Sequence, residues 1–402
     1  MNFIQNIFSI KNDDTYHKII RILGIKIKIK NVNKYVLYQL SNLINDRTAQ
    51  VISNEQILAQ DSVRVVSQDA TNSIRAVAQE INGFTQHTLL NKNILYNNDF
   101  EKQYVEQFYV VYESADFQEK FLKLVNGLDE DSAKTIATII NRQLAIRNTL
   151  GQPNDIYNLE EKNKIRELNE NFWPLIIKLS EEMYALGKYL LPINHFEPSV
   201  FYDKHGLDYV KDLESIKNKD IIDAGGFIGD SILILSPLTN KAVYSFEPVV
   251  ANYELMKKTV QFNNIKNAVC ENYALGNNKD IIEINVNSSA SSVSDLIVNE
   301  TKYVSKCDVI KLDDYVFENN LDVGLIKVDL EGYEQKFLAG AMRTIKEQKP
   351  VLLLSIYHNP DDFFNIKPLI ESWNLGYTFK VFKPVDYSIS LETLLIAEVV
   401  KN

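Results

Sequence analysis

Residues 220–231 constrain the fold of this chain more than any other stretch. A short apolar run ends in the acid Asp223, glycines follow at positions 225, 226 and 229, and Asp230 and Ser231 are residue types found at helix starts. This order predicts a strand, a tight turn and the first turn of a helix. Glycine lets the backbone adopt a positive φ and approach a ligand, at which helix N–H groups then point. We therefore predict a nucleotide-type binding turn.

A second apolar run of strand length, residues 241–246, follows and ends in Glu247 and Pro248. A carboxylate at the carboxyl end of a strand can accept hydrogen bonds from both hydroxyls of a ribose. Phe227 stands where the dinucleotide fingerprint has its middle glycine, and the acid Asp223 precedes the turn. An acid at that place suits a cationic or amine-bearing ligand better than a pyrophosphate.

With this turn and this ribose acid, the chain resembles the class I S-adenosylmethionine-dependent methyltransferases. Three later segments narrow the resemblance to the FkbM-type methyltransferases: residues 272–276, 326–334 and 355–362. The resemblance covers about residues 200 to 400. It implies a methyltransferase domain over residues 201–402, built on a Rossmann-like, seven-stranded, mainly parallel sheet whose last strand is inserted antiparallel.

The alternation of short apolar runs and helical patterns after residue 200 independently predicts an α/β fold with helices on both faces of an open sheet. Strands are expected near residues 220–223, 242–246, 268–273, 324–329, 350–356, 377–382 and 393–399. Ligands of such sheets bind beyond the carboxyl ends of the strands, at the point where the strand order reverses. The motifs above fall at those ends.

The resemblance implies S-adenosylmethionine as the cofactor and places its site by position. The residues expected to contact the cofactor are Asp223, Ala224, Gly225, Gly226, Gly229, Asp230, Ser231, Glu247, Pro248, Asn272, Tyr273, Ala274 and Asp329. Within this set, Glu247 is the expected ribose ligand. Asn272 and Tyr273 are the candidates for contacts with the adenine.

Methyl transfer from a sulfonium to a hydroxyl is an in-line displacement that also requires removal of a proton. We predict Asp329, Glu331 and His358 as the catalytic residues, because they follow the fourth and fifth strands of the expected sheet. The pKa of a histidine suits proton removal near neutral pH, but whether His358 or an acid is the base stays open. The three side chains can also be interpreted as ligands of a divalent ion. Because nothing in their spacing requires one, we predict no metal site.

For the acceptor, the candidate contacts are Tyr357 and two serines, Ser291 and Ser292, of a serine-rich segment. Such segments are usually flexible linkers, but a similar segment often precedes the fourth strand in FkbM-type proteins. That family includes enzymes for macrolide and glycan hydroxyls. The resemblance therefore implies an O-methyltransferase for a hydroxyl of a sugar or glycan precursor, with surface polysaccharide biosynthesis as its setting.

The first part of the chain is basic. Residues 25–30 alternate isoleucine and lysine, which is the pattern of a half-buried strand with one cationic face. We expect residues 1–34 to form a small hairpin whose lysines protect a sheet edge. Contact of these lysines with anionic lipid or a partner is the alternative.

Residues 35–98 contain no proline and a single glycine, and apolar residues recur at every seventh position. This pattern predicts a long helix, either a coiled-coil-like oligomerisation region or an intramolecular helical hairpin. Residues 99–200 are expected to form a helical domain without chemistry of its own, with helices at 133–150 and 172–191. Dense aromatic residues in this part are expected to be core.

The net charge of −10 argues against a nucleic-acid partner held through its phosphates. The two cysteines, Cys270 and Cys307, imply no disulfide framework and favour a reducing, cytoplasmic compartment. No apolar run approaches the ~20 residues that span a bilayer. Two other functions remain as alternatives: a nicotinamide-dependent oxidoreductase, which shares the strand, glycine turn and ribose acid, and an oligomeric scaffold with a vestigial nucleotide site.

Overall fold

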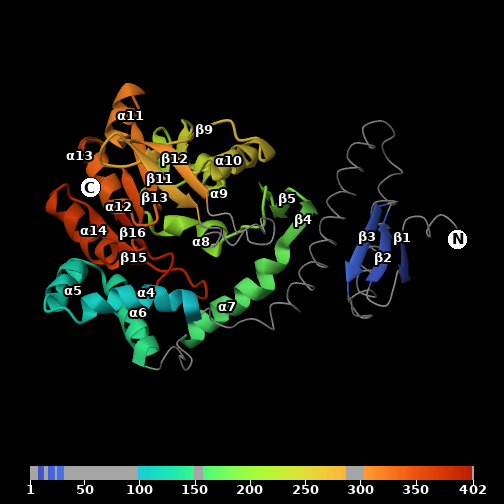
Figure 1. Cartoon of the computed structure of the whole chain (residues 1–402), viewed down its shortest axis with the longest axis horizontal. Coiled ribbons are helices and arrows are strands. Elements are labelled where there is room, and N and C mark those ends of the chain that lie inside the picture. Colours follow the sequence, from blue (N-terminus) through green and yellow to red (C-terminus); the bar gives the residue numbers. More distant parts are fainter. Residues whose placement is uncertain are drawn as a thin grey trace. The chain divides into compact units, whose positions relative to one another are not determined.

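The computed structural model describes residues 8–12, 17–22, 25–30, 98–148, 157–286 and 303–400. The predictions for residues 35–97 and for Ser291 and Ser292 lie outside the described residues. The chain divides into two compact units, which are described separately (Figure 1). One comprises Met1–Ile94 and Asn169–Ile177, and the other comprises Leu95–Leu168 and Lys178–Asn402.

The basic N-terminal segment of the first unit forms a three-stranded antiparallel sheet of β1 (Phe8–Asn12), β2 (His17–Ile22) and β3 (Ile25–Lys30). The sequence predicted a small hairpin for residues 1–34, and the described part of this segment contains three paired strands. The first unit also contains the short 3-10 helix η1 (Trp173–Leu175).

The second unit begins with helices, as expected from the sequence. They are α4 (Asn98–Tyr112), α5 (Phe117–Val125), α6 (Glu130–Asn148) and α7 (Leu159–Asn171), whose last residues belong to the first unit. Asp129 Oδ1 accepts a hydrogen bond of 2.7 Å from the N–H of Ser132 at the start of α6. The helix predicted over 133–150 is therefore confirmed, together with its acidic start.

The helix predicted over residues 172–191 is wrong. This segment contains β4 (Ile176–Ser180), β5 (Met183–Leu186) and β6 (Tyr189–Leu191). Leu186 pairs with Tyr189, so β5 and β6 are joined by the two residues Gly187 and Lys188, and Gly187 has a φ of +55°. A glycine with positive φ in a two-residue loop is a strong hairpin signal, which the continuous apolar pattern concealed.

A seven-stranded sheet organises the second unit, and all seven predicted strands are confirmed. In spatial order they are β15 (Thr378–Phe382), β16 (Leu394–Glu398), β14 (Val351–Ser355), β13 (Val323–Val328), β7 (Asp220–Ala224), β8 (Val243–Phe246) and β9 (Ala268–Glu271). Strand β16 is antiparallel to both of its neighbours, and the other pairs are parallel. The strand order reverses between β7 and β13, where ligands of such sheets bind.

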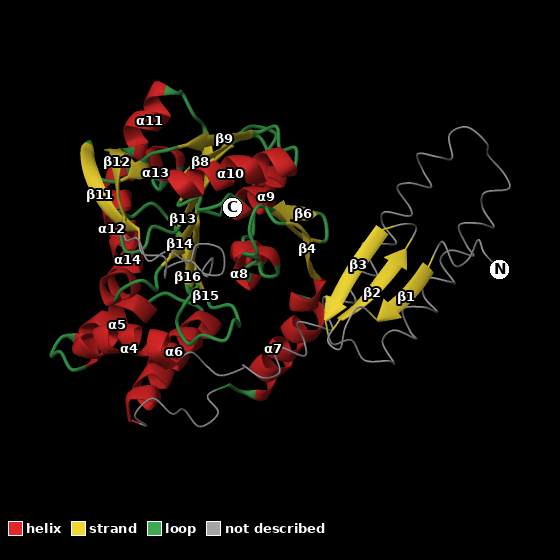
Figure 2. Ribbon diagram, turned by 45° about the vertical axis from the view of Figure 1, so that its right-hand side comes forward, coloured by secondary structure: helices red, strands yellow, loops and turns green. Residues whose placement is uncertain are grey.

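Helices cover both faces of this sheet (Figure 2). Alternate residues of the central strands belong to two different apolar clusters, as the pleat of a sheet requires. One cluster joins the sheet to α4, α5, α6, α12 (Glu334–Gly340), α13 (Met342–Gln348) and α14 (Pro360–Ser372), and the other joins it to α9 (Asp230–Leu235) and α10 (Val250–Phe262). The first cluster also includes residues of α11 (Leu312–Glu318), and the second includes residues of α8 (Pro198–Phe201), η2 (Lys204–Tyr209) and η3 (Leu213–Ile216), with η4 (Ser236–Leu238) packed against it.

A small second sheet lies in the chain between β9 and β13 and was not predicted. It consists of β10 (Ala274–Leu275), β12 (Tyr303–Ile310) and β11 (Asp280–Val286), in that spatial order. No helix within the described residues is both long enough and apolar enough to cross a membrane.

The boundary expected at residue 200 does not separate two compact units. Helix α4 packs on α14 through Phe108 and Phe363, whose ring centroids lie 5.4 Å apart in a T-shaped arrangement. The ammonium of the buried Lys367 donates a hydrogen bond to the carbonyl of Asn126, after α5. The aromatic helical faces are therefore core, as expected, but they belong to the same core as the sheet.

Candidate active site

The glycine turn after β7 packs directly against two neighbouring strands. Gly225 has a φ of +87°, and a Cβ added to it would lie 1.8 Å from the carbonyl oxygen of Asp329. A Cβ on Gly226 would lie 2.1 Å from Oγ of Ser245. The space that these glycines leave open is thus occupied by the ends of β13 and β8. This differs from the expectation that they make room for a ligand.

The residues that open α9 point into the protein. Gly229 precedes the helix with a φ of +83°, and Asp230 and Ser231 are 6% and 2% exposed. Nε2 of His205 lies 3.0 Å from Oγ of Ser231. Burial, followed by the charge of Lys327, lowers the pKa of His205 to about 3, so that this imidazole is neutral. His205 is a site residue that the sequence analysis did not find.

Asp223 is fully buried and its charge is balanced inside the sheet. Its Oδ1 lies 3.2 Å from Nζ of Lys327, and its Oδ2 accepts a hydrogen bond of 2.6 Å from Ser245. Lys327 also donates a bond of 2.8 Å to the carbonyl of Gly225. Burial alone would lower the pKa of Lys327, but the surrounding carboxylates, Asp223 first, outweigh it and raise this pKa. Asp223 and Lys327 therefore hold the turn in place.

Glu247 lies at the carboxyl end of β8 and is 5% exposed. Its two oxygens accept hydrogen bonds of 2.9 Å from the backbone N–H groups of Phe227 and Val249. Burial raises the pKa of Glu247 to about 7. Because a carboxylate has about four acceptor positions, these bonds orient the side chain and leave it able to bind hydroxyl donors.

Asn272, which follows β9, is hydrogen-bonded to the segment that follows β8. Its Nδ2 donates hydrogen bonds to the carbonyls of Glu247, at 2.8 Å, and Pro248, at 3.1 Å. Tyr273 is partly buried against the core, and Ala274 is buried. The structure thus brings the predicted residues after β7, β8 and β9 to one edge of the sheet, with Asn272 as a positioning residue for the segment that carries Glu247.

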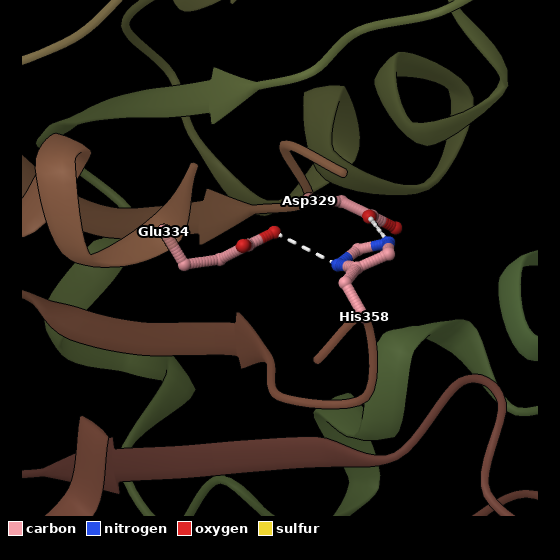
Figure 3. Close-up of side chains that lie close together, drawn as sticks. All are labelled: Asp329, Glu334 and His358. Atoms are coloured by element: carbon pink, nitrogen blue, oxygen red, sulfur yellow. Dashed lines mark ion pairs between the residues drawn. The ribbon is translucent and has the colours of Figure 1, made fainter. Parts of the chain in front are cut away.

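A histidine and three carboxylates form the second part of the site, and Figure 3 shows His358 with two of them, Asp329 and Glu334. Nε2 of His358, in the segment after β14, lies 3.2 Å from Oδ1 of Asp329 and 3.7 Å from Oε2 of Glu331. Nδ1 of the same ring lies 3.0 Å from Oε1 of Glu334. The three predicted catalytic residues are therefore together. Glu334 was missed, although its position at the start of α12, three residues after Glu331, brings it onto the same site.

The charges of this histidine group, defined as Asp329, Glu331, Glu334 and His358, are unequally exposed. The side chain of Glu334 is fully buried, that of His358 is 4% exposed, that of Asp329 is 26% exposed and that of Glu331 is 76% exposed. Glu334 also accepts a hydrogen bond of 2.8 Å from the N–H of Leu330. Solvent therefore reaches the group at Glu331 and is excluded from it at Glu334.

The pKa shifts in the group decide which member can take a proton. Burial would lower the pKa of His358, but the carboxylates of Asp329 and Glu334 outweigh it and raise it well above 6.5. Burial would raise the pKa of Asp329, but His358 and Lys327 lower it to about 2. Partial desolvation and neighbouring carboxylates raise the pKa of Glu331. At neutral pH the imidazole therefore holds its proton, which argues against His358 as the base, and Glu331 is more basic than Asp329.

Tyr357, the predicted acceptor contact, is buried beside His358, with ring centroids 4.1 Å apart. Its hydroxyl donates a hydrogen bond of 3.1 Å to Glu392. Burial, and then repulsion from Asp329, raises the pKa of Glu392 to about 8. Glu392 precedes β16 with a φ of +61°, and no sequence pattern indicated its place at the site.

Comparison with protein families gives one match. Residues 223–379 match the family model of the methyltransferase FkbM domain. This match confirms the resemblance that the sequence motifs indicated. The matched range contains all four residues of the histidine group. No curated protein sequence matches the chain.

Several solved structures resemble the chain at low identity. Methyltransferase FkbM from Methylobacillus flagellatus KT has 20% identity and a TM-score of 0.45, over 70% of this chain and 58% of that protein. A putative methyltransferase from Streptococcus mutans in complex with SAH has 13% identity and a TM-score of 0.29, over 47% of this chain and 95% of that one. TYW2 from M. jannaschii in complex with AdoMet has 14% identity and a TM-score of 0.29, over 55% of this chain and 88% of that one. At these TM-scores the matches establish no detail of the site.

Proposed function

We propose that this chain, which carries a methyltransferase FkbM domain over residues 223–379, transfers a methyl group from S-adenosylmethionine to a hydroxyl of a sugar or glycan precursor. One observation carries the proposal. Two sets of polar groups flank the reversal of strand order, with Glu247 oriented by backbone N–H groups on one side and the histidine group on the other.

The donor side fits the chemistry of S-adenosylmethionine. Glu247 would accept hydrogen bonds from the ribose hydroxyls, and Asn272 holds the segment that carries it. Asp329 stays ionised at neutral pH because its pKa is lowered to about 2, which suits the ammonium of the donor. When bound, the donor supplies an electrophilic methyl group on a positively charged sulfur.

The acceptor side can take up a proton. A sugar hydroxyl has a high pKa, so a base near the reacting oxygen assists transfer. Glu331 is the proton acceptor in this proposal, since its pKa is raised and its side chain is accessible. The imidazolium of His358 would hold the carboxylates in position, and Tyr357 and Glu392 offer hydrogen bonds to a polyhydroxylated acceptor. Ser291 and Ser292 remain predicted acceptor contacts.

We propose that the reaction takes place on the cytoplasmic side, during surface polysaccharide assembly, and that the protein has no nucleic-acid partner. Self-association through residues 35–98 and contact of the basic first residues with a membrane surface remain predictions.

Calorimetric titration of the purified protein with S-adenosylhomocysteine and, separately, NAD tests the donor. We expect micromolar binding of S-adenosylhomocysteine, weakened by about 1–3 kcal/mol in Glu247→Ala, because hydrogen bonds to a charged group are lost. Glu254→Ala, an exposed acid on α10, is the matched control and should bind like the native chain. Asp223→Ala is unsuitable because it would leave Lys327 buried without its partner.

The other outcomes favour the two alternatives. Binding of NAD alone would overturn the methyltransferase proposal in favour of a nicotinamide-dependent oxidoreductase. Binding of neither compound would favour a scaffold with a vestigial nucleotide site.

A further inference from the structure

The structure assigns a divalent-cation site to the histidine group. We infer that Nε2 of His358, Oδ1 of Asp329 and Oε2 of Glu331 coordinate the ion, and that Glu334 supports the imidazole from its other nitrogen. The sequence alone predicted no metal here, because residue spacing does not reveal how these side chains converge.

The ligand atoms of Asp329 and His358 are spaced as they would be around a small divalent ion, and the side chain of Glu331 has to move to join them. With metal–ligand bonds of about 2.1 Å, neighbouring ligand atoms lie about 3.0–3.5 Å apart. Oδ1 of Asp329 lies 3.2 Å from Nε2 of His358, and Oε2 of Glu331 lies 3.7 Å from it. A small rotation of the Glu331 side chain, which is 76% exposed, would complete the set.

Both nitrogens of the imidazole face carboxylates. The side chain of His358 is 4% exposed, and in the described part of the chain neither ring nitrogen has an aligned hydrogen-bond partner. The contacts in Figure 3 are ion pairs by distance. Binding of an ion at Nε2 would displace the proton that this nitrogen holds in the ion-free protein, so that the metal-bound imidazole would be neutral and keep its N–H at Nδ1, toward Glu334.

Glu334 has a different role from the other two carboxylates. One oxygen or nitrogen from each of Asp329, Glu334 and His358 lies within 4.8 Å of the others. However, Glu334 contacts Nδ1 of His358, whereas Asp329 contacts Nε2. Because one ion cannot bind both nitrogens of a single ring, Asp329 and Glu334 cannot both be ligands of an ion bound to His358. A metal-bound histidine commonly donates its other N–H to a carboxylate, which fixes the ring. Glu334 is buried and placed for that contact.

Charge and access also favour a cation on the Nε2 side. Three carboxylates surround one imidazole, and the ammonium of Lys327, whose charge acts on Asp329, is bound to Asp223 and to the carbonyl of Gly225. The partly exposed Asp329 and the exposed Glu331 give an ion a way in. One imidazole nitrogen with two carboxylate oxygens suits Mn²⁺ or Zn²⁺ better than Mg²⁺, which prefers oxygen ligands alone.

An ion at this place would lie beside the groups to which we assign the proton transfer. It would bind and polarise the acceptor hydroxyl, while the second oxygen of Glu331 stays free to accept the proton. This consequence rests on the proposed function. Ion binding itself does not, because it needs neither donor nor acceptor.

The test is equilibrium dialysis of the full-length, metal-stripped protein against Mn²⁺, with electron paramagnetic resonance of the bound ion. We expect one Mn²⁺ per chain, about tenfold or more weaker binding in Glu331→Gln, and tighter binding of Mn²⁺ than of Mg²⁺. Glu318→Gln, an exposed acid at the end of α11, is the matched control and should bind like the native chain. Because Glu331 is exposed, its variant should fold normally.

Three results would overturn the assignment. The first is an absence of saturable binding up to about 1 mM Mn²⁺, since a protein ligand set that needs a higher concentration would be weak. The second is binding of Mn²⁺ that neither Glu331→Gln nor Asp329→Asn changes. The third is equal affinity of the native protein for Mn²⁺ and Mg²⁺. Saturable Mn²⁺ binding in a protein that fails to bind S-adenosylhomocysteine would support the site and reject only the proposed function.

Discussion

Two charged groups at the same edge of the sheet differ in the kind of partner that holds them. In the turn group, defined as Asp223, Lys327 and Glu247, each charge meets backbone or hydroxyl partners in hydrogen bonds. In the histidine group, the ring of His358 meets carboxylates at ion-pair distances without aligned hydrogen bonds. The chain itself holds the turn group in place, with acceptor positions on Glu247 left for hydroxyl donors, whereas the histidine group retains capacity for a cation.

This difference predicts where substitutions take effect. Changes in the turn group should reduce stability, since they leave buried partners unsatisfied. Changes at the open side of the histidine group should reduce ion binding and turnover with little effect on stability.

The largest effect is expected from Lys327→Met. It leaves the buried carboxylate of Asp223 without its counter-charge, so urea unfolding should show a loss of about 3–5 kcal/mol. The double variant Asp223→Asn/Lys327→Met should recover part of this loss, because no buried charge is then left unpaired. A loss under about 1 kcal/mol in the single variant would contradict the pairing.

Gly225→Ala should be the next most damaging, and Gly376→Ala is its matched control. Both glycines have a similar positive φ, +87° and +85°, but nothing lies within 4 Å of a Cβ added to Gly376. The control should lose about 1–2 kcal/mol of unfolding free energy for its backbone conformation alone. Gly225→Ala should lose about 1–3 kcal/mol more, because its Cβ meets the carbonyl of Asp329. Equal losses would show that the turn can move away from β13.

The pKa of Glu247 predicts a loss of stability as pH rises. Its folded-state pKa is about 7 against an ordinary value of 4.5, so the folded protein binds this proton more tightly than the unfolded chain does. The unfolding free energy should therefore fall between about pH 4.5 and 7, by about 2–3 kcal/mol for this group. Glu247→Gln should remove that part of the fall when unfolding is compared at pH 5 and pH 8. A fall of the same size in Glu247→Gln would show that another group causes the pH dependence.

Glu331→Gln should change stability least, by less than about 0.5 kcal/mol, because the side chain is 76% exposed. Donor affinity should stay the same, whereas turnover should fall about a hundredfold if Glu331 takes the proton. Calorimetry and a methyl-transfer assay on one preparation separate these quantities. Unchanged turnover would remove Glu331 from the reaction.

The sheet was predictable from the sequence because its buried strands are short apolar runs that end in polar motifs. The positions of Glu247, Asp329 and His358 at the carboxyl ends followed from that order. Lys327 was missed because its partner Asp223 belongs to a different strand, and ion pairs between strands leave no local pattern.

Errors arose where local patterns were ambiguous. The apolar run over 172–191 was compatible with a buried helix, and Gly187 was the residue that marked the hairpin. The glycines after Asp223 were correctly identified as a turn, but the sequence cannot tell whether a ligand or the chain itself occupies the space beside them.

Because α4 and α5 pack on α14, the chain cannot be shortened to its seven-stranded sheet without exposing part of its core. The part of the chain that matches the methyltransferase FkbM domain, residues 223–379, is shorter than the part that folds together. A chain shortened to residue 201 would uncover Phe363 and deprive the buried ammonium of Lys367 of the Asn126 carbonyl. The smallest piece of this chain with a complete core therefore begins upstream of the seven-stranded sheet, at the helices that pack on α14.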